Sequence, residues 1–258
     1  MSQGYSEPEA AVPGVRILSP DDLRSVLVAG MRDFARAPAF GLFFAAVYVL
    51  CGWIIAYALM STGNFWWILP AAAGFPILGP FIACGLYEVS RRREVGEPLI
   101  WSEVLGVIRR QKDRQIPSMA AVVVIFFLFW NIVSHMVFAL FMGTQPMVNI
   151  SNSFEIFMTA NGLTLLAVEI LVGAVFVSVL FSLTVVSLPL LLDREVDFVT
   201  AMLTSTDVVR ANPVLILSWG ITIGGALFFA MLPAFLGLLV VLPVLGHASW
   251  HLYRRALD

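Results

Sequence analysis

Two histidines, His247 and His251, stand four residues apart near the end of the last apolar stretch of the chain. Four residues are about one turn of an α-helix, so both imidazoles are expected on one helix face. Imidazole pairs with this spacing can bind a transition metal or haem iron, or pass a proton. This pair is the first candidate for a chemical site.

Other ligand-type side chains align with this pair when three apolar stretches are compared at their prolines, residues 80, 189 and 243. Four residues after each proline stand Cys84, Asp193 and His247, and eight residues after it stand Glu88, Asp197 and His251. Thiolate, carboxylate and imidazole are all competent metal ligands. The candidate metal ligands are therefore His247, His251, Cys84, Asp193 and Glu88. The alternative, which the sequence favours, is that these polar groups only reach water and headgroups from helix ends.

Two more ionisable residues, His135 and Glu169, lie within long apolar stretches, where a charge is costly. No Lys or Arg lies near Glu169 in its apolar stretch, so we expect a protonated, hydrogen-bonded carboxyl group. His135 is expected to hydrogen-bond a neighbouring helix. A proton or ion site at these two residues is the alternative.

The composition predicts an all-α integral membrane protein. The chain of 258 residues is 60% hydrophobic and 12% charged, far from a soluble domain, and its mean hydropathy is +0.91. A spanning helix needs roughly 20 apolar residues, and six stretches meet this need, at about 38–60, 66–88, 117–142, 163–191, 213–232 and 234–252. Lys and Arg number 15 against 17 Asp and Glu, and nucleic acid is not expected as a partner.

The basic residues predict an orientation. All 15 Lys and Arg residues lie in the segments 16–36, 91–114, 194–210 and 254–255, which flank the apolar stretches on one side. By the positive-inside rule, both termini are expected to face the cytoplasm. A dense basic cluster is a candidate binding surface for lipid headgroups. It consists of Arg91, Arg92, Arg93, Arg109, Arg110, Lys112 and Arg114.

A repeated pattern predicts the organisation of the chain. An amphipathic helix over residues 19–36, with Asp33 on its polar face, ends before Pro38, and similar apolar stripes precede Pro117 and Pro213. We therefore predict three hairpins of two membrane helices, each preceded by an interfacial helix, as pseudo-threefold parallel repeats over about 19–95, 99–195 and 196–258. Residues 1–18 are rich in Pro, Glu, Ser and Gly and are predicted to be a disordered cytoplasmic tail. Residues 19–258 then form one membrane domain.

Five segments carry a resemblance to a known family: Phe75–Glu88, Ser187–Arg194, Thr200–Met202, Asn212–Pro213 and Leu242–Arg254. They are similar to the DUF2189 family of predicted bacterial integral membrane proteins, and the resemblance extends over about residues 36–255. It implies a multi-pass inner-membrane protein without an established activity. A link of such proteins to cytochrome c oxidase subunit I would require six metal-binding histidines, and this chain has three.

Three function classes remain open. They are an accessory or scaffold subunit of a membrane complex, a respiratory complex included; a transporter of a small solute, ion or proton; and a metal- or haem-binding membrane protein. No catalytic motif, such as HExxH or a Walker loop, is present, so enzymatic activity is not favoured and no cofactor is predicted. The expected partners are the lipid bilayer and either another membrane protein or further copies of the chain. We favour the accessory role, with transport second.

Overall fold

The structure, a computed structural model, describes residues 14–62, 68–111, 114–143 and 158–258. These ranges are helical apart from turns and one isolated bridge between Val15 and Leu257. The helices are α1 Pro20–Arg36, α2 Pro38–Thr62, α3 Ile68–Val95, α4 Trp101–Gln111, α5 Ile116–Met142, α6 Ala160–Thr184, α7 Ser187–Asp193, α8 Phe198–Ala211, α9 Pro213–Met231 and α10 Leu238–Ala256.

Short amphipathic helices precede the long ones, as the sequence predicts. Helix α1 begins with a capping box, in which Ser19 and Asp22 satisfy each other's backbone N–H groups. Asp197 caps α8, because its Oδ1 accepts the N–H groups of Val199 and Thr200, both at 2.9 Å. Asp197 therefore has a local structural role.

Four segments of the described residues are long and apolar enough to cross a membrane: Pro38–Tyr57, Ile116–Met142, Ala160–Asp193 and Pro213–Met231. The sequence predicts six. Helix α10 is not among the four, because His247, His251 and two arginines make its second half polar. The predicted stretch 66–88 begins outside the described residues. The pseudo-threefold symmetry stays a prediction.

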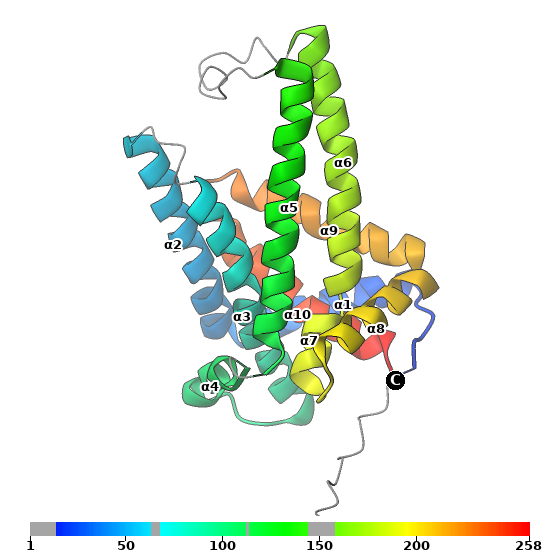
Figure 1. The fold of residues 1–258 in the computed structure, drawn as a ribbon. Helices are drawn as coiled ribbons and strands as arrows, with labels where there is room; N and C mark the ends of the chain where they lie inside the picture. The colour runs from blue at the N-terminus through cyan, green and yellow to red at the C-terminus, as the bar shows by residue number, and fades with distance from the viewer. Residues whose placement is uncertain (1–13, 63–67, 112–113, 144–157) are drawn as a thin grey trace, which may run out of the picture.

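The helices form a base from which one long hairpin projects. In Figure 1, α5 and α6 run side by side well beyond the other helices, and α4 and α7 lie near their foot. Helix α10 packs along α1 and also contacts α2 and α3. Gly30 makes the α1–α10 approach close, since a Cβ there would lie 2.5 Å from the Val244 carbonyl oxygen and 2.7 Å from the Ala248 nitrogen.

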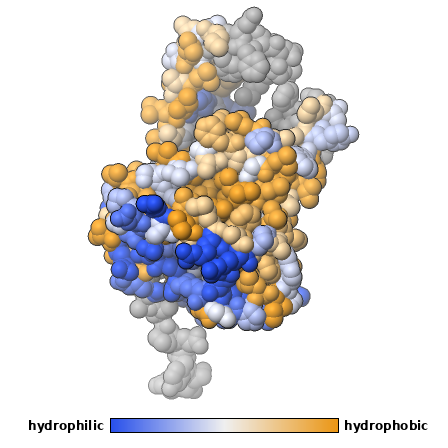
Figure 2. Space-filling view, turned by 180° about the vertical axis from the view of Figure 1, so that it is seen from behind, coloured by the Kyte–Doolittle hydropathy of each residue, from blue (hydrophilic) through white to orange (hydrophobic). Residues whose placement is uncertain are grey.

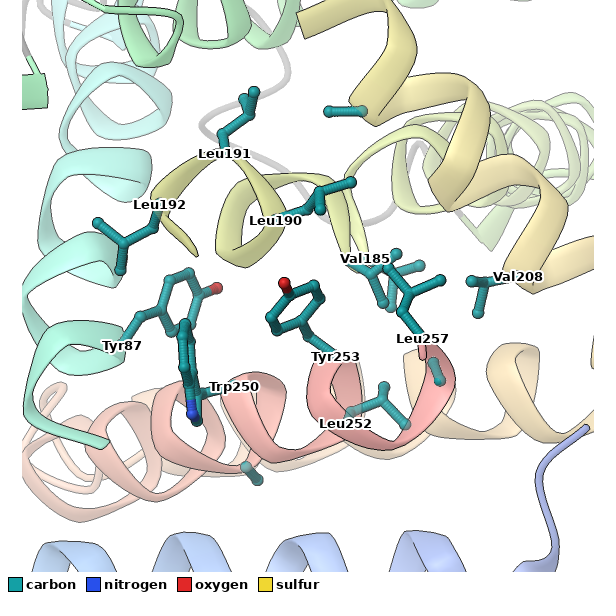
Figure 3. Packing of buried hydrophobic residues seen from close by; sticks show 14 of the residues in the cluster. Tyr87, Val185, Leu190, Leu191, Leu192, Val208, Trp250, Leu252, Tyr253 and Leu257 are labelled. Carbon is teal, nitrogen blue, oxygen red and sulfur yellow. The ribbon is translucent and has the colours of Figure 1, made fainter. Parts of the chain in front are cut away.

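Buried aromatic and aliphatic residues join α3, α7 and α10. Figure 3 shows Tyr87, Trp250 and Tyr253 packed below Leu190 and its neighbours on α7. All these side chains are almost fully buried, so the three helices have little freedom to shift independently. On the face shown in Figure 2, hydrophilic residues gather in the lower part of the molecule and apolar residues above them.

The N-terminal segment contacts the C-terminus. Residues 14–18 are ordered against the C-terminus: the Arg16 N–H donates to the Ala256 carbonyl at 2.9 Å, and Leu18 is buried. Asn212 holds this segment from the other side, accepting the Leu18 N–H at 2.6 Å and donating to the Arg16 carbonyl at 2.9 Å. Residues 14–18 thus have backbone partners in the structure, and the extent of the disordered tail stays a prediction. Residues 1–13 lie outside the described residues.

Candidate functional site

Five polar side chains meet where α1, α3 and α10 converge. This polar cluster consists of Asp33, Ser90, Arg93, His247 and His251. Asp33 is its centre: Arg93 Nε donates to Asp33 Oδ1, and His251 Nε2 and Ser90 Oγ both donate to Asp33 Oδ2, each at 2.8 Å. Ser90 Oγ also lies 2.8 Å from His247 Nδ1. The cluster thus links three helices that are far apart in sequence.

The sequence of α1 explains how a carboxylate reaches this position. Val26, Gly30 and Asp33 are buried and follow helical spacing, so they form one stripe against α10. The absent side chain of Gly30 lets the backbones approach, and Asp33, about one turn further along α1, then meets His251. The sequence instead predicts Asp33 on the polar, solvated face of this helix. The available signal for its burial was Gly30, a small residue about one turn before Asp33.

Hydrogen-bond chemistry settles the protonation pattern of the cluster. A carboxylate only accepts hydrogen bonds, so the single Ser90 hydroxyl proton points to Asp33. His247 must then donate its Nδ1–H to Ser90 Oγ, which leaves Nε2 of the neutral ring as an acceptor. That Nε2 is buried and has no hydrogen-bond partner among the described residues.

Asp33 remains ionised well into acid. Burial would raise the pKa of Asp33, but the hydrogen bonds from His251, Arg93 and Ser90 outweigh burial. Together they lower the pKa from its ordinary value of 3.8 to about 2. Asp33 and Arg93 therefore form an ion pair at neutral pH, and His251 and Ser90 donate to the same carboxylate.

The cluster contains a serine, a histidine and an aspartate, but not in the order of a hydrolase triad. In a triad the imidazole lies between the hydroxyl and the carboxylate, whereas Ser90 here lies between Asp33 and His247. Both Ser90 and His247 are 0% exposed, so no substrate reaches the hydroxyl in this conformation. The arrangement can position helices or relay a proton over a short path.

The sequence-predicted metal ligands divide among different partners. His247 and His251 join the polar cluster. Glu88 accepts Arg91 Nε at 2.8 Å and Arg92 Nε at 2.7 Å. Asp193 accepts the Tyr253 hydroxyl at 2.6 Å, and Cys84 is buried in the hydrophobic core. Across the described ranges, no group of three or more His, Cys, Asp and Glu residues has a metal-binding arrangement.

A second polar group lies on the α5–α6 hairpin. Ser134 Oγ of α5 donates to Glu169 Oε1 of α6 at 3.0 Å, which provides the hydrogen bond expected for that carboxyl group. His135 is exposed, and its Nδ1 lies 2.7 Å from the Asn131 carbonyl oxygen of its own helix. The structure brings Glu169 to Ser134, and it shows no hydrogen bond between Glu169 and His135.

The predicted basic cluster also divides. Arg92 is buried and paired with Glu88 and Glu103, and Arg93 belongs to the polar cluster. Arg91 pairs with Glu88 at 2.8 Å and with Glu97 at 3.1 Å. The remaining described members, Arg109, Arg110 and Arg114, are exposed. Lys112 lies outside the described residues.

Residues 68–193 match the family model described as "Predicted integral membrane protein (DUF2189)". This chain carries a DUF2189 region. The resemblance inferred from the sequence is confirmed there, and its extension to residues 36–67 and 194–255 stays a prediction. The DUF2189 region begins with α3 and ends with α7, so it contains Ser90 and Arg93 but not Asp33 or the histidine pair. No curated protein and no solved structure matches the chain.

Proposed function

We propose that this DUF2189 protein is a non-enzymatic accessory or scaffold subunit that docks on another membrane protein through the α5–α6 hairpin. Contacts of α5 with α3 and of α6 with α8 connect the hairpin to the rest of the molecule. The proposal rests on one observation: two ionisable residues, His135 and Glu169, lie on apolar helices whose side chains are largely exposed.

The hairpin has few contacts with the rest of the chain. Only 17% of the apolar window of α5 and 6% of that of the α6–α7 segment are buried. Large apolar side chains cover its surface, for example Ile132, Leu140 and Ile170, which are 58%, 80% and 72% exposed. Lipid alone solvates such side chains well.

Lipid alone does not satisfy the two ionisable side chains of the hairpin, Glu169 and His135. Glu169 is half-buried and receives one side-chain donor among the described residues, Ser134, and His135 is exposed within the candidate span of α5. In hydrocarbon, such groups face other protein helices or water-filled cavities, because unsatisfied polar groups are costly there. The partner that fits is a membrane helix with hydrogen-bonding side chains at the depth of His135 and Glu169.

A photo-reactive amino acid at Ile132 or Ile170 tests the proposal in native membranes. We expect one discrete protein adduct from each position, and its loss in the double variant His135→Leu with Glu169→Leu. Ile221 on α9, which is 76% exposed, is the matched control and should give no such adduct. Lipid adducts alone at Ile132 and Ile170 would overturn the proposal. An adduct with twice the mass of the chain would show that the partner is a second copy of this chain, not another protein.

We also propose a membrane topology. Both termini lie on the cytoplasmic side of a bacterial inner membrane, and α3 and α10 are spans in addition to the four candidate spans, which gives six in all. The support is the confinement of all 15 Lys and Arg residues to segments on one side of the apolar stretches. A reporter fused after Gly143 should lie outside and one after Arg114 inside; the reverse result would contradict this orientation.

Metal or haem binding at His247 is a second proposal. The observation that favours it is the buried Nε2 without a partner among the described residues, because this is the free ligand atom of a neutral imidazole. Purified protein should then contain bound metal or haem, and His247→Ala should remove it. Equal, near-zero contents in both proteins would reject it.

A further inference from the structure

A basic pocket lies at the foot of the long hairpin, away from the polar cluster. Its volume is about 260 Å³, and it is lined by Glu88 and Arg91 of α3, Val107, Arg110 and Gln111 of α4, Arg114, and Leu192 and Asp193 of α7. In Figure 1, α4 and α7 flank the lower end of α5, where this pocket lies. We call it the headgroup pocket.

The charges of the headgroup pocket favour an anion. Its two carboxylates already have partners: Glu88 is bound by Arg91 and Arg92, and Asp193 accepts the Tyr253 hydroxyl. Arg110 has no ion pair within the described residues. Arg114 has only Glu195, which is 75% exposed, and an exposed pair of this kind contributes little. Arg110 and Arg114 can therefore turn to a bound anion at small cost.

Gln111 supplies an independent sign of a ligand. Its side chain lines the pocket, is only 3% exposed, and its Oε1 has no hydrogen-bond partner among the described residues. A buried amide oxygen without a partner is unfavourable, because it has lost its hydrogen bonds to water and gained none from the protein. A ligand that offers a hydroxyl group beside an anionic oxygen removes this cost, and an amide provides both a donor and an acceptor for it.

The position of the pocket relates it to the membrane surface. Arg114 comes two residues before Ile116, where the candidate span of α5 begins. Val107 and Leu192 form an apolar part of the lining. Guanidinium groups bind phosphate oxygens with two parallel hydrogen bonds, which an ammonium group cannot match. Basic pockets between helices at this depth bind phospholipid headgroups.

We infer that the headgroup pocket binds one phosphate group that carries a hydroxyl-bearing substituent, with Arg110 and Arg114 on the phosphate and Gln111 on the hydroxyl. Phosphatidylglycerol provides this chemistry from the bilayer, and a free phosphate ester provides it from solution. Arg109, one residue away and also exposed, does not line the pocket and takes no part.

The test uses the full-length protein in nanodiscs of phosphatidylcholine with increasing phosphatidylglycerol, read by native mass spectrometry and by thermal unfolding. We expect one retained phosphatidylglycerol and a raised Tm. Removing each arginine should weaken binding about fivefold, since one charge near a lipid surface contributes about 1 kcal/mol. The variants are Arg110→Gln and Arg114→Gln, alone and together, with Arg109→Gln as the matched control.

A further variant, Gln111→Glu, keeps the size of the side chain and adds a negative charge beside the phosphate. It should abolish retention of phosphatidylglycerol while the protein without this lipid still unfolds cooperatively. Inorganic phosphate and glycerol 3-phosphate, added to phosphatidylcholine nanodiscs, distinguish the source. A rise in Tm with glycerol 3-phosphate that exceeds the rise with inorganic phosphate at the same concentration assigns the site to a soluble ester. Equal loss in Arg109→Gln and in the double variant, or no retained lipid and no Tm rise with any probe, would overturn the inference.

Discussion

The base contains a buried acid, Asp33, and the hairpin contains a half-buried acid, Glu169. The two carboxyl groups differ in how many hydrogen-bond donors they receive. Asp33 in the base receives three donors, from Arg93, His251 and Ser90, all at 2.8 Å. Glu169 in the hairpin receives one side-chain donor among the described residues, Ser134, at 3.0 Å. From this difference in the number of donors we infer an internal structural site at Asp33 and a proposed external partner at Glu169.

The same distinction applies to the basic residues. Arg92 and Arg93 turn inward and are paired with carboxylates, whereas Arg110 and Arg114 remain exposed at the edge of a pocket. Side chains with complete partners inside the chain stabilise the base. Those without complete partners mark where lipid or protein is expected to bind.

The largest expected effect comes from removing the central acid. Asp33→Asn should lower the free energy of unfolding by about 3 kcal/mol, because it leaves the partly buried Arg93 without its counter-charge and removes the carboxylate that accepts the His251 hydrogen bond. Thermal or denaturant unfolding in mild detergent measures this. The control is Asp21→Asn, an exposed acid of the same helix, which should change stability by less than about 0.5 kcal/mol. A similar small change in both variants would remove the special role of Asp33.

Acid provides a milder way to break the same cluster. The pKa of Asp33 is about 2 in the folded protein against an ordinary 3.8, so its stabilisation is complete above about pH 4 and is lost as the pH falls towards 2. The shift corresponds to about 2 kcal/mol. Arg93, His251 and, through Ser90, His247 are the groups that face this carboxylate. The stability difference between the native protein and Asp33→Asn should therefore shrink between pH 4 and pH 2; a constant difference would contradict the prediction.

The smallest stability effect is expected in the hairpin. Glu169→Gln keeps a hydrogen-bonding partner for Ser134 and should change the free energy of unfolding by less than about 1 kcal/mol. The same change should weaken the photo-adduct at Ile170, because a neutral amide replaces the carboxyl group offered to the partner. Unfolding and crosslinking measured on the same preparation separate the two effects. A loss of stability as large as that of Asp33→Asn would make Glu169 part of the internal structure instead.

Local features of the fold could be predicted from the sequence because they depend on short-range physics. The boundaries of α1, α2, α5 and α9 follow from Ser19 as a cap, from the prolines at 38, 117 and 213, and from apolar runs of spanning length. The DUF2189 resemblance is confirmed over residues 68–193. The hydrogen-bonded state of Glu169 follows from the cost of a bare carboxyl group in an apolar helix.

The candidate site was only half predictable. The spacing of His247 and His251 indicates one helix face, but a pattern along one helix contains no information about which residue lies opposite. Asp33 stands more than 200 positions earlier in the chain, on a helix whose sequence predicts a solvated polar face. The order of ligand-type residues predicted polar layers, yet Glu88 pairs with Arg91 of its own helix α3, and Asp193 accepts the Tyr253 hydroxyl of α10.

By itself, the sequence determined that this is a helical membrane protein with amphipathic helices before its long apolar ones, because hydrophobic run length, helix periodicity and caps are properties of neighbouring residues. Only the tertiary structure decided which polar groups are satisfied. The close approach of α1 and α10 at Gly30 brings Asp33 to His251, and the meeting of α3, α4 and α7 makes a pocket of Arg110 and Gln111. Such contacts depend on how whole helices pack, which no local pattern specifies.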